Sequence, residues 1–226
     1  MIVGTPLDEE EVLAGPSLEA LKHSKVIIGE SRNVTLRWLK RSLVPVDDKE
    51  LLFYDPNPVK VLSDVGRVME QCGRGGGMVV LLSDAGMPIL FDPGREVLEL
   101  GRRHGFHIRS CPSATSWGTA CAMSGFSPPF YIQGFTARET ELRRREIGRL
   151  AKLKEAVVLI DTPYRFRALL RVCLESFGSL RESFLAWEIS KKNETYIWGS
   201  LGRLEKECAE KKLEKGEFVL IIKGEP

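Results

Sequence analysis

The sequence predicts an α/β fold built as two domains, the first with a largely parallel sheet and the second with a mixed sheet. In the first half, short apolar runs alternate with amphipathic helical patterns, which is typical of parallel α/β layers. In the second half, two strand patterns follow each other with no helix between them, which predicts a hairpin and therefore a mixed sheet. A segment of small residues joins the halves, so the expected domains are residues 1–112 and 113–226.

In the first half, apolar runs of strand length alternate with segments of helical periodicity. The expected strands are Val26–Ile28, Leu51–Phe53, Met78–Leu82 and His107–Cys111. The expected helices are Ser17–His23, Thr35–Arg41, Lys60–Cys72 and Gly94–Arg103. Asp92 is placed to cap the last of these helices, with Pro93 in its first turn, where the missing N–H costs nothing. The glycine cluster Gly73–Gly77 precedes a strand rather than following one, so it predicts a turn and not a phosphate-binding loop.

The second half begins with a helix in the small-residue segment SATSWGTACAMSG. The expected strands are Phe130–Ile132, Ala156–Ile160, Ser183–Trp187, Glu194–Trp198 and Phe218–Ile222. The other expected helices are Arg138–Leu153, Tyr164–Ser176 and Leu201–Lys212. Thr162 and Pro163 begin the middle one, as a capping residue followed by a proline in the first turn.

Composition excludes several classes of protein. With 33 Lys and Arg against 31 Asp and Glu, the net charge is +2, so the overall charge does not indicate nucleic-acid binding. Binding through a local basic patch remains an alternative. No apolar run approaches the roughly 20 residues of a membrane span. The five cysteines include no CxxC pair and the N-terminus does not resemble a secretory signal, so we expect reduced thiols and a cytoplasmic protein. Three histidines and no GxSxG motif leave little material for a zinc site or a serine hydrolase, so no metal is expected.

The most informative stretch for chemistry is Met78–Gly94, in which a buried strand runs into a polar loop and then a helix. Ligands of open α/β sheets bind beyond the carboxyl ends of the strands. Asp84 lies at the strand end, too early to cap the next helix, so it forms either a structural ion pair or a contact with a ligand amine or hydroxyl. Residues Ser113–Ser116 lie at another change from strand to helix, and favour close ligand approach and tight helix packing about equally.

One helix is unusually basic. Seven basic residues and three acidic ones lie between Arg138 and Lys154. They form either a solvated helix face with ion pairs at i,i+4 or a surface that contacts the phosphates of RNA. Arg165, Arg167 and Arg171 on the next helix could extend that surface.

Several motifs together resemble the tetrapyrrole methylase superfamily, the class III methyltransferases that depend on S-adenosylmethionine, and within it the ribosomal RNA small-subunit methyltransferase I branch. The motifs are MIVGTPL, IIGESRN, SDAGMPILFDPG, CPSATSWGTACAMSGF, IDTPYRF, LAWEISKKNETYIWGSL and KGEFVLIIKG, in order along nearly the whole chain. The acidic Glu-Asp-Thr-Arg block of that branch is reduced here to Glu30-Ser31-Arg32-Asn33. A shorter branch of the family therefore remains an alternative.

The resemblance implies a homodimer of two-domain chains, with S-adenosylmethionine in the cleft between the domains. The cofactor-binding residues that it implies are Pro6, Ser83, Asp84, Ala85, Gly86, Met87, Ser113 and Ala114. Asp84 would contact the polar part of the cofactor. Glu30 is the candidate catalytic base or orienting group, and the alternative for Glu30 is a structural ion pair with an arginine.

Three functions are consistent with these residues. The first is methylation of a cytidine ribose 2′-hydroxyl in small-subunit ribosomal RNA, which the resemblance and the basic helix favour. The second is methylation of a tetrapyrrole or another small molecule, whose binding would depend little on salt, whereas RNA binding weakens steeply as salt rises. The third is a non-catalytic binding protein that has kept the fold and lost the cofactor.

Overall fold

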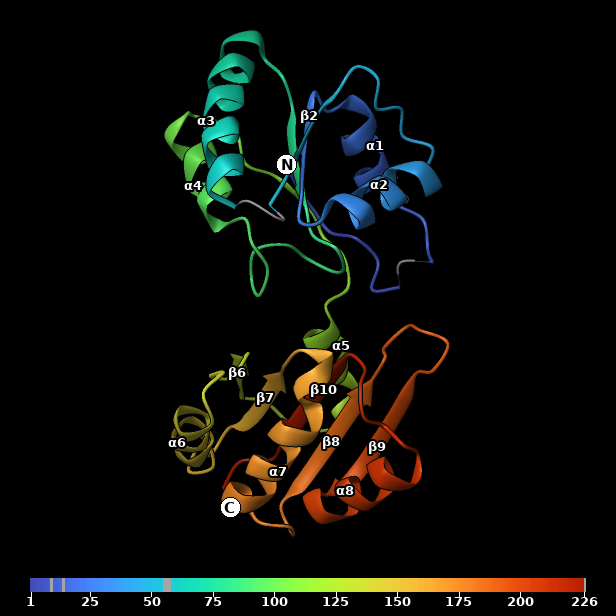
Figure 1. Ribbon diagram of the computed structural model, residues 1–226, viewed down its shortest axis with the longest axis vertical. Coiled ribbons are helices and arrows are strands. Elements are labelled where there is room, and N and C mark those ends of the chain that lie inside the picture. The colour runs from blue at the N-terminus through green and yellow to red at the C-terminus, as the bar shows by residue number, and fades with distance from the viewer. Residues whose placement is uncertain (9, 14, 55–57, 226) are drawn as a thin grey trace. The chain divides into compact units, whose positions relative to one another are not determined.

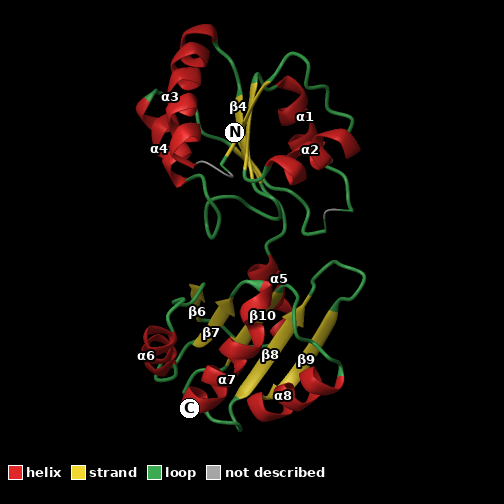
Figure 2. Cartoon of the chain, in the orientation of Figure 1, coloured by secondary structure: helices red, strands yellow, loops and turns green. Residues whose placement is uncertain are grey.

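The computed structural model describes residues 1–8, 10–13, 15–54 and 58–225 (Figure 1). The chain forms two compact units, residues 1–115 (unit 1) and residues 116–226 (unit 2). Each unit contains a five-stranded sheet with helices packed on it, as Figure 2 shows in yellow and red. Within the described part of the chain, none of the helices combines the length and hydrophobicity that a membrane crossing requires.

Unit 1 is built on a parallel sheet with the strand order β3-β2-β4-β1-β5. Its strands are β1 (Ile2–Val3), β2 (Val26–Gly29), β3 (Glu50–Phe53), β4 (Val79–Leu82) and β5 (Ser110–Cys111). The central strands β2 and β4 are buried along their whole length, as expected of a parallel sheet that helices cover on both faces. The predicted parallel sheet is confirmed, and β1 is an additional strand that the sequence pattern did not predict.

Helices cover both faces of this sheet. They are α1 (Gly15–His23), α2 (Arg32–Arg41), α3 (Pro58–Gly75) and α4 (Arg95–Arg103). Figure 1 shows α1 and α2 on one side and α3 and α4 on the other. Alternate strand residues serve the two cores, because successive side chains of a strand point to opposite faces. Ile27 and Val80 pack with α1 and α2, whereas Ile28 and Leu81 pack with α3 and α4.

Three local expectations in unit 1 are corrected. Helix α4 begins at Arg95 with Gly94 as its N-cap at φ 127°, so the expected cap by Asp92 is wrong. The carbonyl of Gly94 accepts the first helical hydrogen bond from Leu98 (3.0 Å). Helix α3 continues through Gly75, into the expected turn. Strand β5 spans two residues rather than five, because it lies at the edge of the described sheet beside the two-residue β1.

Unit 2 contains a mixed sheet with the strand order β6-β7-β10-β8-β9. Its strands are β6 (Phe130–Gly134), β7 (Ala156–Ile160), β8 (Glu182–Trp187), β9 (Thr195–Ser200) and β10 (Phe218–Ile222). Its helices are α5 (Ser116–Ser124), α6 (Thr140–Leu150), the 3-10 turn η1 (Pro163–Arg165), α7 (Phe166–Phe177) and α8 (Leu201–Glu210). Strands β6 and β7 are parallel, and the other pairs, including the predicted β8–β9 hairpin, are antiparallel. The predicted mixed sheet is therefore confirmed.

The core of unit 2 lies between one face of its sheet and helices α6, α7 and α8. Phe166, at the start of α7, is fully buried and meets Trp187 and Phe218 edge to face, with ring centroids 5.0 and 4.8 Å apart. Such aromatic contacts add to the free energy gained by burying the rings. Helix α5 packs on the opposite face, against β10 and β8.

Candidate functional site

The loops that follow β1, β4 and β5 meet at the carboxyl edge of the unit 1 sheet. The backbone amide of Thr5 donates to the carbonyl oxygen of Gly86 (2.8 Å). The Ser113 hydroxyl donates to the carbonyl oxygen of Thr5 (2.6 Å), and the Ser113 amide lies 3.3 Å from the Met87 sulfur. Because parallel strands all end at the same edge, three segments far apart in the sequence become one surface.

Two glycines permit this close approach. A Cβ atom on Gly4 would lie 2.5 Å from the Cβ of Ser113 and 2.7 Å from the Met87 sulfur, so any side chain there would push the loops apart. Gly86 has φ +76°, a conformation that glycine adopts without strain. A Cβ on Gly86 would lie 3.4 Å from the carbonyl oxygen of Ala114. Backbone atoms of the three loops are therefore packed directly against one another.

A second set of contacts joins the β4 loop to the start of α2. Both carboxylate oxygens of Asp84 accept hydrogen bonds from Ser31, one from its amide (3.1 Å) and one from its hydroxyl (2.7 Å). In return, the Asp84 amide donates to Oε2 of Glu30 (3.1 Å). The indole N–H of Trp38 donates to the Asp84 carbonyl oxygen (3.0 Å). Asp84 is thereby fixed at the N-terminus of α2, where the helix dipole favours a negative charge.

The carboxylates of Glu30, Asp84 and Asp92 form an acidic cluster at this edge. Burial raises the pKa of Glu30, with a smaller upward effect from the charge of Asp84, while the hydrogen bond from the Asp84 amide opposes them. Burial, followed by the charges of Glu30 and Asp84, raises the pKa of Asp92 to about 7. The cluster therefore takes up a proton near neutral pH. Partly buried acids with such shifts are typical of sites that bind cations or transfer protons.

All of the residues that the sequence singled out for a cofactor lie at this edge of unit 1. Pro6 follows Thr5 directly, and Ser83–Met87 and Ser113–Ala114 are the segments just described. The Ser83 side chain is buried and closes its own turn by donating to the Gly86 carbonyl oxygen (3.1 Å). Sequence reasoning missed Trp38 and the bonds from Ser31 to Asp84. Only the position of Ser31 just before a helix hinted at a polar role.

Unit 2 has its own polar cluster at the carboxyl ends of β6 and β7. The Asp161 side chain is fully buried and accepts hydrogen bonds from the Thr136 hydroxyl (2.9 Å) and the Thr162 amide (2.7 Å). It also forms an ion pair with Arg165 (3.2 Å). Arg165 in addition donates to the carbonyl oxygens of Thr136 (3.2 Å) and Ala137 (2.5 Å). The guanidinium of Arg165 therefore points into unit 2 and links the ends of β6 and β7.

This arrangement corrects part of the expected basic surface. Arg165 is committed to Asp161, and Arg167 donates to the carbonyl oxygen of Cys208 on α8 (3.0 Å). The guanidinium of Arg165 is therefore directed into the unit, and that of Arg167 is half-buried and bonded to α8. Arg171 alone of the three is exposed.

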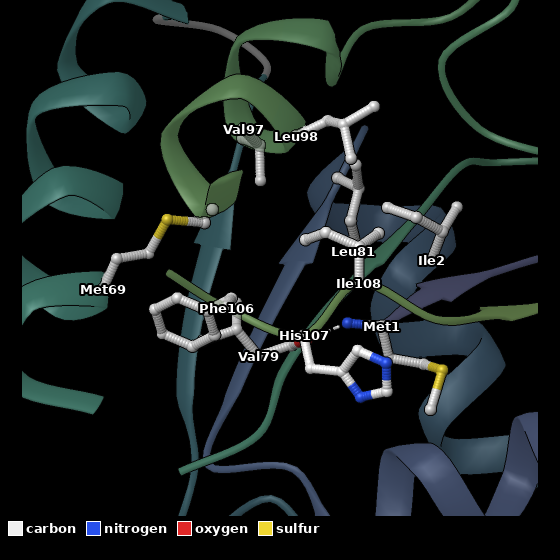
Figure 3. A pocket seen from close by; sticks show the side chains of 11 residues that line it. Met1, Ile2, Met69, Val79, Leu81, Val97, Leu98, Phe106, His107 and Ile108 are labelled. Atoms are coloured by element: carbon white, nitrogen blue, oxygen red, sulfur yellow. Dashed lines mark hydrogen bonds between the residues drawn. The ribbon is translucent and has the colours of Figure 1, made fainter. Parts of the chain in front are cut away.

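A small apolar cavity lies at the opposite, amino edge of the unit 1 sheet (Figure 3). Its walls include Met69 of α3, Val97 of α4 and Phe106 of the following loop, and the N-terminal amine nearby donates to the Val79 carbonyl oxygen (2.7 Å). Its volume is about 30 Å³, which is about the space of one water molecule. It is far too small for a nucleoside, so the carboxyl edge is the better candidate for the functional site.

Comparisons with known proteins agree with the family that the sequence motifs resemble. The sequence matches the family model for Tetrapyrrole (Corrin/Porphyrin) Methylases over residues 1–205. It is 30% identical to a Ribosomal RNA small subunit methyltransferase I of Leptospira borgpetersenii, covering 98% of this chain and 86% of that protein. A protein of the same name from Thermotoga maritima is also 30% identical, with 99% and 97% covered.

The fold is likewise found among solved structures. Uroporphyrin-III C-methyltransferase from Thermus thermophilus, solved in complex with S-adenosyl homocysteine, superposes with a TM-score of 0.60 at 18% identity, covering 99% of this chain and 95% of that one. The match to the family model spans most of the chain, and two relatives reach 30% identity over almost all of it. The chain therefore belongs to the tetrapyrrole methylase family, whose members are methyltransferases that use S-adenosylmethionine.

Proposed function

We propose that this methyltransferase acts on small-subunit ribosomal RNA, at a cytidine ribose 2′-hydroxyl, and that its methyl donor binds at the carboxyl edge of unit 1. The observation that carries the proposal is the acidic cluster of Glu30, Asp84 and Asp92 beside the loops of Gly86 and Ser113. The names of the two relatives that are 30% identical support RNA as the acceptor.

The residues at this edge fit the chemistry of S-adenosylmethionine. The donor carries a positive sulfonium and a positive ammonium group, and the cluster supplies carboxylates; burial, and then the charges of neighbouring acids, raise the pKa values of Glu30 and Asp92, and a bound cation would favour their charged forms. The close packing at Gly4 and Gly86 fixes the three loops, so a ligand beyond this edge would meet their main-chain donors and acceptors in set positions. The proposed cofactor-contacting residues are Pro6, Ser83, Asp84, Ala85, Gly86, Met87, Ser113 and Ala114.

When bound, S-adenosylmethionine supplies an electrophilic methyl group for attack by an oxygen nucleophile. The task of the protein is to orient the acceptor and to receive its hydroxyl proton. We assign the proton to Glu30, whose carboxylate is held by the Asp84 amide and whose raised pKa makes it a stronger base. Ser31 holds Asp84 by two hydrogen bonds, and the Asp84 amide in turn holds the Glu30 carboxylate. Glu30, which receives the proton, therefore has a fixed position. Burial, and then the charges of Glu30 and Asp84, raise the pKa of Asp92 to about 7, so the protonation of Glu30 and that of Asp92 influence each other.

A small-molecule acceptor is the second candidate, because the matching family is described as corrin and porphyrin methylases. The salt dependence of acceptor binding distinguishes the two candidates. RNA binding weakens steeply as salt rises, and binding of a neutral small molecule does not. A homodimer that acts in the cytoplasm also belongs to the proposal. The five cysteines are unpaired, which suits a reducing compartment.

The first test is calorimetric titration of S-adenosylmethionine into the wild-type protein and three variants. We expect Asp84→Ala to lose binding, and the exposed Asp47→Ala of the same unit to retain it. Glu30→Gln removes one charge of the cluster but keeps an oxygen that can accept from the Asp84 amide, so it should weaken donor binding far less than Asp84→Ala does. No detectable binding by the wild-type protein would contradict the proposed site.

The second test is transfer of a labelled methyl group to small ribosomal subunits that lack the modification. Glu30→Gln should slow transfer by about 10²- to 10⁴-fold, the usual contribution of a general base. Digestion of the labelled RNA to nucleosides then identifies the acceptor atom. Label on a base, or label only on added tetrapyrroles, would contradict the ribose assignment.

A further inference from the structure

Helix α6 carries a row of exposed basic side chains. Arg145 and Arg149 lie four residues apart on the helix, and Lys152 follows three residues later, just past its C-terminus. At a rise of about 1.5 Å per residue, the two arginines are one turn, or about 6 Å, apart along the axis. All three side chains are exposed, and α6 lies at the β6 end of the unit 2 sheet (Figure 1). We call these three residues the basic row.

The acidic residues of the same segment are occupied elsewhere. Glu139 caps the helix by accepting from two backbone amides, which together with nearby arginine charge lowers its pKa. Glu141 pairs with Arg144 (3.1 Å). Glu146 accepts from the Ala137 amide (2.8 Å). The ion pairing at i,i+4 that a solvated helix would show is therefore missing from the basic row.

The remaining arginines at the start of α6 differ from the row. Arg143 is buried and donates to the carbonyl oxygens of Ala137 (3.0 Å) and Arg138 (2.8 Å). Arg144 links α6 to α7 through an ion pair with Glu175 (3.4 Å). Among the described residues, Arg145, Arg149 and Lys152 take part in no ion pair, and like charges one turn apart destabilise a helix slightly. Three exposed cations that form no ion pair within the described chain are thus concentrated on one segment of a protein whose net charge is +2; hydrogen bonds from two backbone amides, and then the charge of Arg145, lower the pKa of Glu139 without an ion pair between the two side chains.

We propose that the basic row binds the phosphate backbone of the RNA strand that carries the methyl acceptor. The inference rests on the proposed function and adds to it the surface that positions the RNA. Two arginines suit this role because a guanidinium can bind a phosphate through two parallel hydrogen bonds. Contacts of this kind give affinity and register without reading sequence, so base recognition lies elsewhere.

The test is fluorescence polarisation of a labelled 20-nucleotide single-stranded RNA of mixed sequence with the full chain, between 50 and 200 mM salt. The test variant is Arg145→Gln/Arg149→Gln. The control is Arg102→Gln/Arg103→Gln on α4, which removes the same charge from two exposed arginines of unit 1. At about 0.7 released counterions per contact, the test variant should reduce the slope of log K against log salt by about 1.4. The same relation gives about 25-fold weaker binding at 0.1 M salt.

The outcomes separate this inference from the proposed function. A weaker, flatter salt dependence in the test variant but not in the control supports the basic row. Equal affinities for all three proteins, or an equal loss in test and control variants, would overturn it. If the wild-type chain methylates ribosomal subunits and the test variant binds RNA normally, the basic row is wrong and the proposed function stands. If the row governs RNA binding but no methyl group is transferred, the proposed function fails and the row stands.

Discussion

The partly buried carboxyl of Asp92 offers a quantitative test of the acidic cluster. Burial, and then the charges of Glu30 and Asp84, raise the pKa of Asp92 to about 7 from an ordinary value of 3.8. The folded state therefore prefers the protonated carboxyl, and the free energy of unfolding falls as pH rises from about 4 to about 7. At about 1.36 kcal/mol per pKa unit, the difference between 7 and 3.8 corresponds to about 4 kcal/mol. Partial solvent exposure of the side chain reduces this to about 2 kcal/mol.

Asp92→Asn has nearly the shape of the protonated carboxyl and cannot ionise. We expect it to exceed the wild-type stability by about 2 kcal/mol at pH 8 and to equal it near pH 4. Urea unfolding followed by circular dichroism at both pH values measures the difference, with the exposed Asp47→Asn as a control that should match wild type throughout. A variant that is less stable than wild type at pH 8, or whose difference is the same at both pH values, would refute the reasoning.

Two further substitutions test the packing of each site. Gly4→Ala places a Cβ 2.5 Å from that of Ser113, so we expect a loss of about 1–3 kcal/mol in urea unfolding together with weaker donor binding; unchanged binding would contradict the proposed role of these loops. Asp161→Ala leaves Arg165 without its buried partner, and we expect a loss of about 3 kcal/mol. Asp161→Asn, which still accepts hydrogen bonds, should lose less, and an equal loss in both variants would show that the hydrogen bonds from Thr136 and Thr162 contribute nothing beyond the charge.

Much of the fold was predictable because its strands are continuous apolar runs. Strands β4 and β10 are buried on both faces, so their residues alone identify them. Strand β1 was not predictable in the same way, since two residues carry no periodicity. Its existence depends on β4 and β5, which come much later in the chain.

The candidate site likewise contains residues that the local sequence predicted and residues whose surroundings depend on distant strands. Asp84 was predictable because it follows a buried strand and comes too early in the chain to cap the next helix, at an edge where α/β sheets bind ligands. Asp92 was expected to cap a helix, which is a local inference. Its raised pKa instead reflects burial and then the charges of Glu30 and Asp84, and the pairing of β2 with β4 brings Glu30 near. The inward orientation of Arg165 likewise depends on a buried aspartate at the end of a strand. Local patterns predicted where polar groups lie, whereas sheet topology decided what they meet.

The position of β1 between β4 and β5 also determines when unit 1 can be completed during synthesis. Ile2 pairs with Leu81 and Ser110, which the ribosome adds 79 and 108 residues later. At about 5–20 residues per second, the first strand waits roughly 4–16 s for its first neighbour. Strand β5 lies at the edge of the described sheet, beside β1, so it joins the sheet last. The loop of Gly4 and Thr5, whose backbone bonds to Cys111 and Ser113, therefore reaches its final place only after these much later residues have been added.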